Sequence, residues 1–74
     1  MTLLDKIEIW RQDNLPVGSE ASSDLCNLIM DLHDDMPDPS DNEVAGYWLL
    51  GLVWDKPSLV EHRDAIKSFV DAAA

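Results

Sequence analysis

Six apolar residues in the middle of the chain recur at the spacing of an α-helix, and this pattern most narrows the possible folds. They are Ala21, Leu25, Leu28, Ile29, Leu32 and Met36. Such spacing places side chains on one helix face. Ser19 can cap this helix, and Pro37 and Pro39 end it because proline disfavours helical geometry in the residue before it. The sequence therefore predicts a helix from Ser19 to Met36 with an apolar face.

Segments near both ends of the chain also have helical spacing. Thr2 is a good N-cap for a helix over about 3–12, although the alternation Ile7-Glu8-Ile9 is a competing strand signal. Pro57 suits the first turn of a last helix. The expected buried stripe of that helix consists of Leu59, Val60, Ile66, Phe69, Val70 and Ala73.

The apolar run VAGYWLLGLVW, residues 44–54, predicts one more helix. Ser40 and Glu43 ahead of it have the order of a capping box, with Ser40 as the N-cap. Because the run is apolar on almost every side, the helix is either enclosed in the core or keeps a face for a partner, and we favour the core. Gly46 and Gly51 lack side chains and could let a neighbouring helix approach closely.

The chain has 74 residues, the size of one domain. Its hydrophobic fraction of 46% and its three tryptophans suffice for a core without metal or disulfide. The sequence therefore predicts an all-α fold. We expect a compact four-helix domain of short helices over residues 1–74, with an apolar central third helix.

Cysteine content and apolar run length suggest a compartment. Cys26 is the single cysteine and cannot form an internal disulfide, and no N-terminal run has the order of a signal peptide. Both features favour cytoplasmic localisation. The run 44–54 is shorter than the roughly 20 apolar residues of a membrane-spanning helix, so we expect no membrane span.

The charge of the chain is strongly acidic. Fifteen acidic and five basic residues give a net charge of −10. This charge repels phosphates and anionic lipid headgroups, so we expect neither direct nucleic acid binding nor membrane binding. It attracts basic protein surfaces, and the largest of these belong to proteins that bind nucleic acid. The alternative is that acidity only keeps the protein soluble.

The acidic residues concentrate in the second predicted helix and the loop after it. No lysine or arginine lies between Arg11 and Lys56. The expected partner-binding residues are Asp24, Asp31, Asp34, Asp35, Asp38 and Asp41, together with Tyr47, Trp48 and Trp54 of the third helix. The alternative is that these aspartates bind no partner and only form a solvated helix face beside a turn.

The sequence carries no pattern typical of a metal or catalytic site. An EF-hand loop starting at Asp31 would have Met36 where it needs glycine and Asn42 where it needs glutamate. The two histidines and Cys26 lack zinc spacing. A nucleophilic site also needs an orienting group and a pocket, for which four short helices leave little volume. We therefore expect no enzyme activity, no metal and no cofactor.

Part of the chain is similar to the acyl carrier proteins, which are acidic four-helix domains. Residues 25–36, LCNLIMDLHDDM, resemble their second helix. Their prosthetic group is attached to the serine of an Asp-Ser-Leu motif, whereas the order here is Ser23-Asp24-Leu25. A carrier role is therefore rejected.

Another resemblance is to the immunity proteins that inhibit DNase colicins and pyocins, which are also small, acidic and four-helical. His33-Asp34-Asp35-Met36, Tyr47-Trp48 and Pro57-Ser58 are similar in order to motifs of that family. Val44 stands where an aspartate is expected there, and the link to the last helix is shorter, so we do not assign the chain to that family.

These observations predict a small protein-binding module. We expect it to occupy a basic surface of a nucleic-acid-processing protein and so inhibit or modulate it, as phage anti-defence proteins and nuclease immunity proteins do. The alternative is a structural subunit that forms a homodimer through residues 44–54. The two differ in salt dependence, because salt screens charge-steered association and does not weaken apolar self-association.

Overall fold

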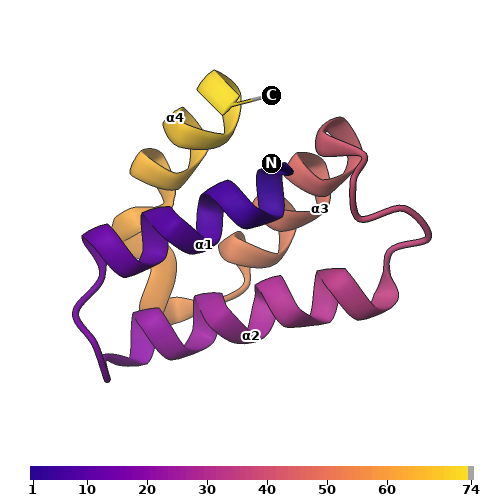
Figure 1. Ribbon diagram of the computed structural model, residues 1–74. Helices are drawn as coiled ribbons and strands as arrows, with labels where there is room; N and C mark the ends of the chain where they lie inside the picture. Colours follow the sequence, from indigo (N-terminus) through magenta and orange to yellow (C-terminus); the bar gives the residue numbers. More distant parts are fainter. Residues whose placement is uncertain (74) are drawn as a thin grey trace.

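The computed structural model describes residues 1–73, which form four α-helices and one 3-10 helix and contain no strand (Figure 1). The α-helices are α1 (Leu3–Asn14), α2 (Glu20–Asp35), α3 (Asn42–Trp54) and α4 (Arg63–Ala73), and the 3-10 helix η1 (Pro57–His62) precedes α4. The predicted all-α, four-helix fold is confirmed.

Helix α1 begins with a reciprocal pair of hydrogen bonds. The Asp5 N–H donates to Thr2 Oγ1 at 3.2 Å, and the Thr2 N–H donates to Asp5 Oδ2 at 3.1 Å. Together they satisfy two backbone donors at the start of the helix. Thr2 is therefore the N-cap, as predicted, and Ile7-Glu8-Ile9 is helical rather than a strand.

Helix α2 runs antiparallel beside α1 after a short turn (Figure 1). The turn contains Gly18 at φ 81°, a left-handed conformation that glycine adopts without strain. Ser19 caps α2 as predicted, its hydroxyl oxygen accepting from the Ser22 N–H at 3.2 Å. The whole predicted apolar stripe from Ala21 to Met36 is buried.

The start of α3 differs from the prediction, because the N-cap is Asp41 and not Ser40. Asp41 Oδ1 accepts from the Val44 N–H at 3.3 Å. Ser40 instead directs both its N–H and its hydroxyl to Asp38 Oδ1 within the loop. The predicted capping box of Ser40 and Glu43 is wrong. Aspartate caps a helix as well as serine does, and the loop contact with Asp38 decides between the two neighbours.

The last predicted helix is two elements. Pro57 opens η1, and α4 begins only at Arg63. Leu59, Ile66 and Val70 are buried as expected, whereas Phe69 and Ala73 are half-buried. Val60 is exposed, so its predicted burial is wrong. A 3-10 helix has three residues per turn, so an apolar stripe extrapolated from α-helical spacing does not hold within η1.

One side of α3 packs tightly against α1 and α4 at Gly46. A Cβ atom at that position would lie 2.9 Å from Val70 Cγ1 and 3.2 Å from Leu3 Cδ2. Glycine therefore permits the close helix approach that the sequence suggested. A Cβ atom at Gly51 would meet no atom within 4 Å, so Gly51 plays no such role inside the protein.

Candidate functional site

The outer side of α3 is exposed and apolar. The exposed fractions are 80% for Tyr47, 56% for Trp54, 39% for Trp48 and 38% for Val44. We call these four residues and the exposed Gly51 the α3 face. Helix α3 contacts every other helix and is central in that sense, but the expectation that it is enclosed in the core is wrong. Its neighbours cover the opposite side only, which consists of Ala45, Gly46, Leu49 and Val53.

A groove of about 560 Å³ follows the α3 face. It is lined by Tyr47, Trp48, Leu50, Gly51, Leu52, Trp54 and Asp55. All of these residues belong to α3 or to the position directly after it, so no other element forms an opposing wall. Substrate pockets enclose most of a small ligand. An open groove along a single helix is better suited to another protein segment than to a small molecule.

Trp54 is held in place at the end of this groove. The Arg63 guanidinium carbon lies 4.1 Å from the centroid of the Trp54 ring, a cation–π contact. Trp54 closes α3 and Arg63 opens α4, with η1 between them. Because the geometry of η1 sets this contact, no local sequence pattern predicts it.

Most of the predicted aspartates lie on an exposed surface. Asp31, Asp34 and Asp35 are exposed on α2, and Asp38 and Asp41 are exposed in the loop that follows. We call these five residues the acidic surface. Within residues 1–73, the side chains of the first three form no hydrogen bond or ion pair, and the side chains of the two loop aspartates accept hydrogen bonds only from their own loop and the start of α3. No lysine or arginine within the described chain forms an ion pair with this surface.

Asp24 differs from the other five. It is half-buried, and its Oδ2 accepts a hydrogen bond from the Ser58 hydroxyl at 2.5 Å. This bond ties the first half of α2 to η1. The structure therefore gives Asp24 a role within the fold, whereas the side chains of Asp31, Asp34 and Asp35 make no such contact.

The acidic surface borders the α3 face. Asp31 and Asp35 lie about two and three helical turns after Asp24, so the three share one flank of α2. The bond from Asp24 to Ser58 shows that this flank is turned toward the chain that follows α3. At the other end of α3, Asp41 caps the helix and Val44 lies in its first turn. The acidic surface therefore meets the α3 face at its start, where Asp41 Oδ1 accepts from the Val44 N–H.

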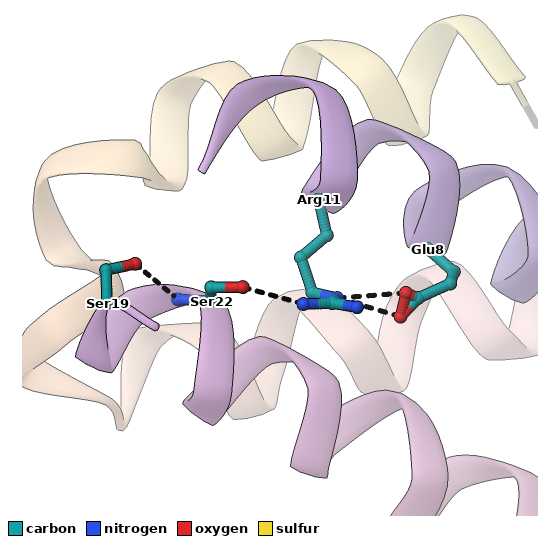
Figure 2. Close-up of polar contacts among 4 residues, drawn as sticks. All are labelled: Glu8, Arg11, Ser19 and Ser22. Carbon is teal, nitrogen blue, oxygen red and sulfur yellow. Dashed lines mark hydrogen bonds and ion pairs between the residues drawn. The ribbon is translucent and has the colours of Figure 1, made fainter. Parts of the chain in front are cut away.

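Arg11, one of the few basic residues, takes part in a polar network between α1 and α2 (Figure 2). Arg11 Nε donates to both carboxylate oxygens of Glu8, at 2.8 and 2.9 Å, and Arg11 Nη1 donates to the Ser22 hydroxyl at 2.6 Å. The hydrogen bond with Glu8 raises the pKa of Arg11. Ser22 is buried, and its N–H donates to Ser19. Arg11 thus joins two helices and is not available to the acidic surface.

A second groove, of about 310 Å³, lies between α1 and α4. Its lining includes Trp10 and Phe69, whose ring centroids are 6.3 Å apart. Both rings are half-buried and pack against the core. This groove is a seam between two helices and brings together no set of catalytic side chains.

The histidines and the cysteine do not form a site with one another in the described structure. His62 Nε2 lies 3.4 Å from Glu61 Oε1, and the hydrogen bonds within residues 1–73 join no histidine to a serine or cysteine. In the same range, no three histidine, cysteine or acidic side chains are grouped closely enough to hold a metal ion.

No protein-family model matches this chain, and no significant match is found among curated proteins or solved structures. None of the helices within residues 1–73 combines the length and the apolar character that crossing a membrane requires.

Proposed function

We propose that this protein is a protein-binding module that recognises a basic surface on its partner. The observation that carries the proposal is the position of the acidic surface beside the exposed aromatic residues of the α3 face. Buried aromatic anchors supply much of the energy of protein interfaces, and surrounding charges steer association. The two surfaces together offer both contributions to one partner.

The partner class follows from the charge. With a net charge of −10, the chain is attracted to strongly basic surfaces, and these are typical of proteins that process nucleic acid. Occupying such a surface would exclude nucleic acid from it, so the proposed role is that of an inhibitor or modulator in the cytoplasm. The role needs no catalytic residue, metal or cofactor.

A second candidate function is self-association through α3 as a structural subunit. The 80% exposure of Tyr47 and the 56% exposure of Trp54 on one side of α3 favour it, because contiguous exposed apolar patches often mark interaction sites. The net charge of −10 on each copy opposes it. We therefore rank it second.

The test compares two variants that change the charge equally. Asp31, Asp34 and Asp35 become lysine in the first, and Asp13, Glu61 and Asp64, which are exposed elsewhere, become lysine in the second. Immobilised wild-type protein and both variants capture proteins from a lysate, and association rates with a captured protein are then measured at low and high salt.

We expect the partner to associate more slowly with the first variant than with wild type, and the association rate to depend less on salt. The second variant should stay close to wild type, because the effect depends on the position of the charges. If the first variant bound the partner at the wild-type rate, the role of the acidic surface would be refuted.

A further inference from the structure

Gly51 lies on the α3 face, and no contact inside the described fold explains a glycine there. Glycine in the interior of a helix is destabilising relative to alanine. At Gly46 the close approach of Val70 and Leu3 accounts for it, whereas a Cβ atom at Gly51 would meet nothing within 4 Å. Gly51 also lines the groove between Tyr47, Trp48 and Trp54. A glycine at this point lets a bound segment approach the α3 backbone closely.

The charge around the groove selects the chemistry of that segment. Asp55 lines the groove at one end, and Asp41 caps α3 at the other end of the helix. Arg63 is engaged by the Trp54 ring, and the net charge of the chain is −10. A segment that fills the groove must therefore have an apolar face with positive charges beside it. A second copy of this chain would bring its own acidic margin against these carboxylates.

We propose that the α3 face binds a basic amphipathic helix of the partner, with Gly51 at the point of closest approach. Helix-in-groove recognition uses apolar side chains at helical spacing on one face of the ligand. The apolar residues would lie against Tyr47, Trp48 and Trp54, and lysines or arginines on the flanks would face the carboxylates. This inference rests on the proposed function and assigns the partner's contact element.

The test uses a synthetic peptide, since the natural partner is unidentified. The span from Val44 to Trp54 rises about 15 Å, so a helix of about 14 residues covers it. The probe is an acetylated leucine–lysine peptide of that length, with leucines on one helical face. The control peptide has the same composition in an order without an apolar face. Tryptophan fluorescence reports binding.

We expect the wild-type protein to bind the amphipathic peptide at least about tenfold more tightly than the control peptide. Gly51→Leu should remove this preference by filling the groove, and it should keep wild-type helicity because its side chain enters open space. Ala65→Leu adds the same side chain at an exposed position of α4 and should bind as wild type does. Tyr47→Ala, at a residue that is 80% exposed, offers a second variant that cannot disturb the core.

Two results would overturn the inference. In the first, both peptides bind equally, or Gly51→Leu and Tyr47→Ala keep the wild-type preference. In the second, sedimentation equilibrium shows a dimer that Gly51→Leu dissociates, which would assign the face to a second copy. The triple variant with lysine at Asp31, Asp34 and Asp35 shows whether the helix-binding inference fails alone or the proposed function fails with it. If lysines at Asp31, Asp34 and Asp35 weaken both peptides while Gly51→Leu has no effect, the acidic surface stands and the α3 groove does not.

Discussion

Alanine substitutions at the two glycines of α3 should have opposite effects on stability. Each change removes the conformational penalty of a helical glycine, about 0.5–1 kcal/mol. At Gly51 the added methyl group enters open space, so the full gain is expected. For a domain of this size that gain corresponds to a rise in Tm of about 2–8 °C.

At Gly46 the same gain meets a steric cost. The new Cβ atom would lie 2.9 Å from Val70 Cγ1, and Val70 is a stiff β-branched residue that is only 3% exposed. Overpacking of a well-packed core costs about 1–3 kcal/mol. Both variants gain the same conformational stabilisation from replacing a helical glycine. The free energy of unfolding of Gly46→Ala should therefore be about 1–3 kcal/mol lower than that of Gly51→Ala.

Urea denaturation followed by far-ultraviolet circular dichroism measures this difference directly. A double-mutant cycle with Val70→Ala locates the clash, because removing Cγ1 should reduce the penalty of Gly46→Ala. Equal stability of the two alanine variants would refute the tight crossing at Gly46. A destabilising Gly51→Ala would refute the assignment of Gly51 to open space.

Three further predictions concern other parts of the fold. Ser22→Ala should lower the free energy of unfolding by about 1–3 kcal/mol in urea denaturation, because the partly buried Arg11 guanidinium loses an acceptor on α2. Hydrogen bonds from Thr2 lower the pKa of Asp5 below its ordinary value of 3.8, so the stabilisation by Asp5 is present above pH 3.8 and is lost as pH falls through the lowered pKa. Asp5→Asn should remove this contribution to the pH dependence of the free energy of unfolding. An NMR titration that gave Asp5 a pKa above 3.8 would contradict the capping role of Asp5. Chelator should leave the Tm unchanged, whereas a rise of several degrees with micromolar calcium would reveal a metal site in the loop 36–41.

Sequence patterns predicted the elements that depend on local interactions. The apolar stripe of α2 and its cap at Ser19 are set by residues within a few positions of each other, and both are confirmed. The α3 cap shifted by one residue because Ser40 and Asp41 are equally suitable and a contact with Asp38 decides between them. The 3-10 geometry after Pro57 has no periodic signature in six residues.

The candidate site could be predicted only in part, because its remaining features depend on distant contacts. The exposure of Asp31, Asp34 and Asp35 follows from the apolar stripe on the other side of α2. Asp24 lies on the same helix, but its bond to Ser58 joins positions 34 residues apart. Tyr47, Trp48 and Trp54 were named from the sequence as possible contacts, and all three are exposed. The sequence nevertheless favoured an enclosed α3, because a helix that is apolar all round has no pattern to show which side its neighbours will cover.

Three features of the proposed binding surface are unfavourable for the isolated fold. Asp34 and Asp35 lie in the last turn of α2, where the helix dipole disfavours negative charge by about 0.3–1 kcal/mol per residue. Asp31 and Asp35 add a like-charge pair at i and i+4. Gly51 adds the glycine penalty on the neighbouring helix. His33 is the basic residue of that last turn, and no lysine or arginine of residues 1–73 forms an ion pair with these aspartates. A partner with a basic helix would offset the two charge terms. Variants that bind such a helix less well should therefore fold more stably, a trade-off typical of residues kept for function.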